Sequence, residues 1–165
     1  NFRILKCTGE SYKINLKIYS IDVNPKFQDK IQNFKSISIN KAVPFGQIPA
    51  LISKFDIALL PIDFTRKGID YARYSISTKT SEYMISGVPI LLFAPEEVAL
   101  TDYARKNDCM YSVYKNDKNI LSQALLSLIK NENLRASLAT KAIEVAKSDS
   151  DANDIREKFR KALTN

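Results

Sequence analysis

Short apolar segments of strand length alternate with segments of helical periodicity through most of this chain. Ile14, Leu16 and Ile18 alternate with polar residues, which predicts a strand that ends near Ser20. The same pattern predicts strands at 36–43, 55–61, 89–93 and 110–113, and helices at 47–54, at 78–86 and from Pro95 onward. Strands that alternate with helices favour a parallel sheet with right-handed crossovers. The predicted fold class is therefore α/β, a Rossmann-like parallel β-sheet with flanking helices.

The segment after the last predicted strand is helical in pattern to its end. It carries three apolar stripes at helical spacing, formed by Ile120, Leu121, Ala124, Leu125 and Leu128, by Leu134, Leu138 and Val145, and by Ala152, Ile155, Phe159 and Leu163. We therefore expect a helical C-terminal tail that packs on the sheet or extends towards a partner. With 165 residues, the chain is expected to form one domain, 1–165.

Composition excludes several classes of function. The chain has no histidine, which removes the Ser–His and Cys–His nucleophile systems, and among its 4 glycines there is no G-x-G-x-x-G dinucleotide motif. Its 2 cysteines lie far apart, which favours a reducing compartment, and we expect neither a signal peptide nor a membrane span. The net charge of +7 suits an anionic partner. Because the cations are spread along the chain, we do not expect nucleic acid to be that partner.

The candidate ligand site is the segment that follows the central predicted strand. Ligands of open parallel sheets bind at the carboxyl ends of the strands, and anions favour helix N-termini. Here a long loop at 62–77 is expected, and a loop of this length is often functional. Its cations and the residues after it are Arg66, Lys67, Arg73, Ser75, Ser77, Thr78 and Lys79. They suit a phosphate site; alternatively, Ser77 or Thr78 is only a helix cap and Lys79 is only solvated.

The run from Ser77 to Ile90, STKTSEYMISGVPI, is more specific. It resembles the donor-site signature of glycosyltransferases with the GT-B fold, in the retaining, glycogen-synthase-like group. Phe55–Pro61 resembles the strand before the family's donor loop, and Leu121–Lys130 with the segment after it resembles its penultimate helices. The resemblance covers about residues 14–163 and implies one half of a GT-B fold.

The resemblance implies a role for each residue of the donor site. Lys79 would be the catalytic residue and, with Ser77 and Thr78, would face the diphosphate or the sugar. Glu82 would accept hydrogen bonds from the ribose hydroxyls, and Val43 would hold the base through its backbone. The alternative for Glu82 is a surface acid that only stabilises its helix.

This sequence departs from the family pattern at two places. Many relatives carry a second Glu eight positions before the ribose Glu, where it contacts the donor sugar, and here that position is Tyr74. A Lys-x-x-Glu-Tyr variant of the family also lacks this Glu. Tyr74 is a substrate-binding candidate, and the contacts with the donor sugar stay open. The family's first strand–helix unit, with its phosphate-binding Arg and Lys, has no match before Ile14, and 1–10 is too short to supply one.

The resemblance also implies the partners of the chain. We expect a donor-binding domain that belongs to a two-domain enzyme, binds a nucleotide diphosphate sugar without a cofactor or metal, and is inactive without an N-terminal acceptor domain. A cytoplasmic location is expected, with a peripheral contact of the full-length enzyme at the inner face of the membrane left open. The rival hypothesis is a non-catalytic Rossmann-like or receiver-type module, for which Asp63 would be the phosphorylated residue.

Overall fold

A computed structural model describes residues 2–3, 7–8, 11–149 and 152–164. The expectations that concern the remaining residues of 1–10 lie outside this part of the chain. Strands are β1 Phe2–Arg3, β2 Cys7–Thr8, β3 Ser11–Tyr12, β4 Leu16–Ser20, β5 Ile37–Lys41, β6 Ala58–Pro61, β7 Ile90–Phe93 and β8 Tyr111–Val113. Helices are α1 Pro25–Ile31, α2 Ile48–Ile52, α3 Arg66–Ala72, α4 Lys79–Ile85, α5 Ala99–Asn107, α6 Lys118–Lys130, α7 Glu132–Asp149 and α8 Ala152–Thr164, with the 3-10 turn η1 at Phe45–Gln47.

Parallel pairing dominates the sheets, as the alternation of elements predicted. The strands β6, β7 and β8 pair in parallel, with Leu59 opposite Leu91 and Leu91 opposite Tyr111. The strands β4 and β5 form a second parallel pair. The short strand β1 adds to the edge of β6 in antiparallel orientation, and β2 and β3 form a small antiparallel pair. The Rossmann-like α/β class is confirmed, with these short antiparallel additions.

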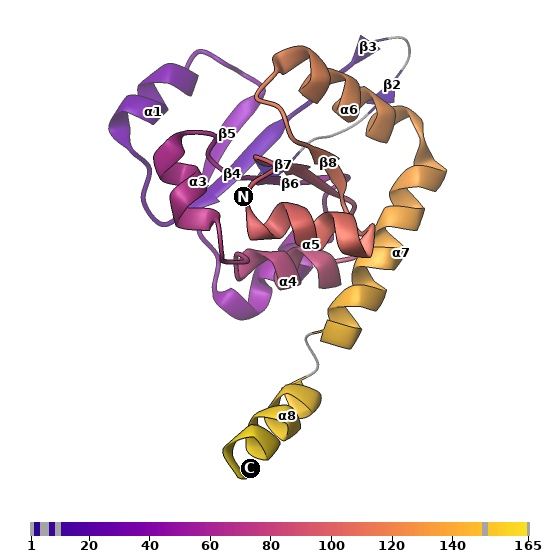
Figure 1. Ribbon diagram of the computed structural model, residues 1–165. Helices are drawn as coiled ribbons and strands as arrows, with labels where there is room; N and C mark the ends of the chain where they lie inside the picture. The colour runs from indigo at the N-terminus through magenta and orange to yellow at the C-terminus, as the bar shows by residue number, and fades with distance from the viewer. Residues whose placement is uncertain (1, 4–6, 9–10, 150–151, 165) are drawn as a thin grey trace.

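Two apolar clusters fill the opposite faces of the sheet around β7. Alternate residues of this strand point to opposite faces, so Ile90 and Leu92 join one cluster while Leu91 joins the other. Helices α4 and α5 cover the first face and α6 covers the second, while α7 contributes to both clusters (Figure 1). A strand covered on both faces must be apolar throughout, which explains the uninterrupted run of β7.

The end of α4 follows the sequence signal closely. Gly87 adopts a φ of 74°, in the left-handed region that glycine occupies without strain, two residues after the helix ends at Ile85. Pro89 then precedes β7. This short connection brings the start of α4 to the same edge of the sheet as the end of β6.

Two expectations about the elements around the site are wrong. The segment 62–77 is no continuous loop, because Arg66–Ala72 forms helix α3. The helix expected from Pro95 starts later, at Ala99. The buried Thr101 hydroxyl donates a 2.7 Å hydrogen bond to the carbonyl oxygen of Pro95, which holds 95–98 as a turn before the helix. Helix α1, which the sequence analysis did not predict, begins with Pro25 after an Asn24 cap.

The helical tail is present as α6, α7 and α8. Helix α8 lies beyond the end of α7 (Figure 1), and its apolar residues Ile155, Phe159 and Leu163 are 50%, 64% and 70% exposed. Within the described residues, no helix is both long enough and apolar enough to cross a membrane.

Candidate donor-binding site

A cavity of about 570 Å³ opens where the carboxyl end of β6 meets α3 and α4. Its floor comes from residues 60–63, its first wall from Gly68, Tyr71 and Ala72 of α3, and its second wall from 75–79 and Tyr83. Parallel strands of open sheets place their ligand sites at this edge. The cavity is therefore in the position that the topology of the chain assigns to a ligand.

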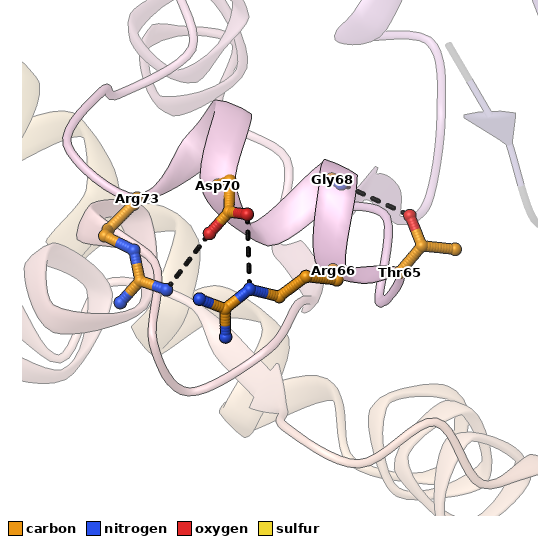
Figure 2. A network of polar contacts seen from close by, with 5 residues as sticks. All are labelled: Thr65, Arg66, Gly68, Asp70 and Arg73. Carbon is orange, nitrogen blue, oxygen red and sulfur yellow. Dashed lines mark hydrogen bonds and ion pairs between the residues drawn. The ribbon is translucent and has the colours of Figure 1, made fainter.

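The wall formed by α3 is held in place by its own polar contacts (Figure 2). The Thr65 hydroxyl accepts a 3.2 Å hydrogen bond from the backbone N–H of Gly68 and so caps the helix. Asp70 forms ion pairs with Arg66 at 3.2 Å and with Arg73 at 3.3 Å. These pairs are largely exposed and contribute little to stability. Two of the four cations that the sequence assigned to a phosphate site, Arg66 and Arg73, are therefore already paired with Asp70.

Asp63 connects the floor of the cavity to α3. Its carboxylate accepts hydrogen bonds from the Thr65 hydroxyl at 2.7 Å and from the Thr65 backbone N–H at 2.9 Å. The hydroxyl bond, and then the backbone bond, lower the pKa of Asp63 below its ordinary value. A Cβ on Gly68 would lie 2.5 Å from the Asp63 Cβ, closer than any real contact, so only glycine fits there. The helix therefore packs directly against the end of β6.

Ser77, Thr78 and Lys79 form the wall opposite α3. Ser77 accepts a hydrogen bond from the Lys79 backbone N–H at 3.4 Å through its hydroxyl, and Thr78 is the N-cap residue without a side-chain cap bond. Arg73, Arg66 and Lys67 are absent from the lining, so Lys79 is the cation that the cavity receives from the described residues. The structure thus brings together three of the six predicted site residues.

Glu82, Val43 and Tyr74 lie outside the lining of this cavity. Glu82 is half-buried on α4, one turn after Lys79. Burial raises the pKa of Glu82, and the positive charge of Lys79 opposes that shift. Val43 is half-buried between β5 and η1, and Tyr74 is 91% exposed between α3 and α4. The proposed roles of these three residues stay predictions.

The residue of this site that the sequence analysis missed is Tyr71. Tyr71 lines the cavity and is 88% exposed, as expected of a residue at its mouth. Once 66–72 is known to be helical, its position follows, since Gly68 and Tyr71 are three residues apart and share one face of a helix. The signal that could have found α3 is Thr65, a capping residue three positions before Gly68.

Two further cavities continue along the carboxyl edge of the sheet. One, of about 500 Å³, lies at the ends of β6 and β7, and another, of about 520 Å³, lies beside Pro95 and Tyr114. Phe64 lines both, and its ring packs on Phe93 with the ring centroids 4.7 Å apart. The edge of the sheet is therefore hollowed from α4 to β8.

Solved structures with a similar fold are glycosyltransferases. Anabaena HepE, solved in complex with UDP, matches with a TM-score of 0.61 and 14% identity over 84% of this chain and 35% of its own. S. aureus TarM, in a structure that contains UDP, matches with a TM-score of 0.66 and 18% identity over 90% of this chain and 29% of its own. Sucrose-phosphate synthase from Thermosynechococcus elongatus matches with a TM-score of 0.67 and 11% identity over 90% of this chain and 38% of its own.

These matches confirm the expected fold, that of the C-terminal half of a GT-B glycosyltransferase. The chain spans about a third of the length of each of these three structures, from 29% to 38%. Neither a protein-family model nor a curated protein sequence matches it. At these identities the likeness concerns the fold, and function must be argued from the site.

Proposed function

We propose that this domain, which shares the fold of a GT-B glycosyltransferase half, binds a nucleotide diphosphate sugar for transfer of its glycosyl group. The observation that carries the proposal is the cavity of about 570 Å³ at the end of β6, with Lys79 and the hydroxyl-bearing Ser77 and Thr78 on one wall. Hydroxyls, a cation and the first backbone N–H groups of a helix suit a phosphate group. The UDP present in the HepE and TarM structures supports the same ligand class.

In this proposal the diphosphate lies against Ser77, Thr78 and Lys79. The Glu82 carboxylate, one turn further along α4, accepts hydrogen bonds from the ribose hydroxyls. The backbone at Val43 contacts the base. Lys79 stabilises the negative charge that grows on the diphosphate as the glycosyl bond breaks, which is the electrostatic contribution that this chain makes to the reaction.

The reaction also needs an acceptor hydroxyl held against the donor sugar. We propose that a second domain, an N-terminal acceptor domain as in two-domain GT-B enzymes, supplies that position. The chain spans only about a third of the length of its structural neighbours, which supports this part of the proposal. A cytoplasmic location is proposed with it, because 2 cysteines that lie far apart favour a reducing compartment.

The receiver-type alternative is less well supported by the geometry around Asp63. Both oxygens of the Asp63 carboxylate already accept hydrogen bonds from Thr65, so this side chain has a structural part in the turn. A receiver needs clustered carboxylates beside the phosphorylated Asp. The part of the chain that the structure describes contains no group of three or more His, Cys, Asp or Glu residues able to hold a metal ion.

Replacement of Glu82 by alanine tests the ribose contact. Glu82→Ala is expected to weaken binding of the preferred nucleotide diphosphate by about 1.5–3 kcal/mol, the range for a hydrogen bond to a charged group. The affinity of the unaltered chain for the nucleotide diphosphate should also fall at acid pH. Protonation of Glu82 removes the carboxylate that accepts the ribose hydrogen bonds, and burial raises the pKa of Glu82. Calorimetric titration measures both effects. Glu144→Ala, an exposed acid on α7, is the control, and equal affinity of the two variants would refute the ribose contact.

The ranking of ligands tests the phosphate contact. Affinity should decrease from nucleoside diphosphate to monophosphate to nucleoside, and diphosphate affinity should fall with rising salt because ions screen an exposed cation such as Lys79. Lys79→Gln should reduce both the preference for the diphosphate and the salt dependence of its binding. Lys67→Gln, on α3 outside the lining, should leave both unchanged. A nucleoside that binds the unaltered chain as tightly as its diphosphate would remove the phosphate site.

A further inference from the structure

The positions of the proposed contacts leave most of the cavity at the end of β6 without an occupant. Ser77, Thr78 and Lys79 form one wall only, and Glu82 and Val43 lie outside the lining. A donor with its nucleoside towards Glu82 and its diphosphate at Lys79 therefore has its sugar on the remaining side, between that wall and α3. From this arrangement, and resting on the proposed function, we propose that the cavity holds the donor sugar and that Tyr71 is the residue on which the sugar ring packs.

The lining suits a sugar ring. A pyranose has apolar C–H groups on its faces and hydroxyls around its edge, so it needs an apolar platform flanked by polar groups. Tyr71 and Ile76 supply exposed apolar surface at the mouth, and the electron-rich face of an aromatic ring attracts C–H groups. Ser75, Ser77 and Asp63 supply polar groups around them. The lining therefore offers both the apolar surface and the polar groups that a pyranose needs.

Tyr71 is also held on a rigid support, as a specificity residue should be. Helix α3 is fixed at its start by the Thr65 cap and along its length by the close contact of Gly68 with Asp63. The carbonyl oxygen of Arg73, just after the helix, accepts a 3.0 Å hydrogen bond from the backbone N–H of Ala99, which ties it to α5. The platform is therefore set before the donor binds, which reduces the entropic cost of binding.

This assignment offers a sugar contact in place of the donor-sugar Glu that many members of the similar family carry. Tyr74 stands at that sequence position, but it is 91% exposed and outside the lining. Tyr71, three residues earlier, reaches the cavity from the helix that replaces the expected loop. Sugar recognition thus shifts from a charged hydrogen-bond acceptor to packing on a ring.

The test compares nucleotide sugars with the nucleotides alone, by calorimetric titration of the purified chain. The ligands are UDP with UDP-glucose, and GDP with GDP-mannose. The unaltered chain should bind a nucleotide sugar more tightly than the matching nucleotide. Tyr71→Ala should weaken that nucleotide sugar about 3- to 10-fold, the scale of an aromatic packing contact, and change nucleotide affinity less than about 2-fold. Tyr71→Phe, which keeps the ring, should bind as the unaltered chain does. Phe159→Ala removes an exposed aromatic ring of α8 outside the lining, and as the control it should change neither affinity.

Each other outcome overturns the assignment. If Tyr71→Ala leaves nucleotide-sugar affinity unchanged, or lowers it no more than Phe159→Ala does, the ring does not contact the sugar. Equal losses for the nucleotide and its sugar would place Tyr71 against the nucleoside or phosphate, with the proposed function intact. If the unaltered chain binds none of the four ligands, the proposed function itself fails and this assignment fails with it. Because Tyr71 is 88% exposed, Tyr71→Ala should keep its circular dichroism spectrum, which separates lost contacts from lost folding.

Discussion

The chain of 165 residues, supplied with a nucleotide diphosphate sugar and an acceptor, is expected to show no acceptor-dependent transfer. The proposed site at the end of β6 would hold the donor, and no described residue has been assigned to orient an acceptor hydroxyl. Holding two reactants in productive geometry contributes about 7–11 kcal/mol, or about 10⁵- to 10⁸-fold in rate. The donor domain alone lacks this contribution, and slow hydrolysis of the donor is the most that we expect.

Release of nucleotide diphosphate is the measurement, made over a panel of sugar donors with and without acceptor. Titration of the same donors controls for binding, so that inactivity can be assigned to the missing acceptor site and not to an empty donor site. A two-domain GT-B enzyme assayed with its own donor is the positive control. Turnover that depends on the acceptor would contradict the half-site proposal. It would direct attention to the two further cavities that share Phe64.

The largest effect on stability is expected from Leu128→Ala. Leu128 is 0% exposed on α6 and packs in the cluster that contains Leu91 of β7. Loss of a fully buried leucine side chain costs transfer free energy and leaves a cavity, together about 2.5–5 kcal/mol of the free energy of unfolding. The free energies of unfolding of small domains are only about 5–15 kcal/mol, so this variant should lose a large part of its stability.

The matched control is Leu126→Ala, two residues earlier on the same helix. Leu126 is 37% exposed, so the same chemical change should cost less than about 1 kcal/mol. Both substitutions lie inside α6 and alter its helix propensity equally. Urea denaturation followed by circular dichroism gives both free energies. Equal losses in the two variants would show that α6 does not cover the sheet face as described.

The sequence predicted the three parallel strands of the central sheet, β6, β7 and β8, because their signal is local and strong. In β7 every residue is apolar, because the strand is covered on both faces, and Gly87 and Pro89 mark where the preceding helix must end. The stripe of α6 was equally readable, since Ala124 and Leu128 recur at helical spacing. For these elements burial determines residue type directly, so the pattern reveals the structure.

Helix α3 could not be predicted in the same way. It has 7 residues, a glycine at its third position and only Ala72 buried, so neither propensity nor an apolar stripe marks it. The contact of Gly68 with Asp63 and the Thr65 cap hold it, and such contacts are visible only after folding. The late start of α5 has a similar cause, since the bond from Thr101 to Pro95 is a tertiary detail of one turn.

The sequence predicted the residues on the α4 side of the candidate site but not those on the α3 side. Ser77, Thr78 and Lys79 were found from a sequence motif, and the cavity brings them together. Tyr71 could not be predicted because the sequence indicates a loop at 62–77, and a loop pattern does not show which side chains share a face. Whether Glu82 and Val43 contact a ligand depends on where that ligand binds, and no sequence pattern determines its position.

The close fit of Gly68 against Asp63 also has a consequence for how this lineage can be recognised. No side chain is accommodated at position 68, the cap uses the hydroxyl at position 65, and that hydroxyl donates to the carboxylate at position 63. Natural selection should therefore have preserved the spacing Asp-x-Thr-x-x-Gly in every descendant that kept this helix, while the exposed residues between them drifted. A search for that spacing, placed between an apolar strand and a Lys-x-x-Glu-Tyr segment, should retrieve relatives that overall identity is too low to reveal.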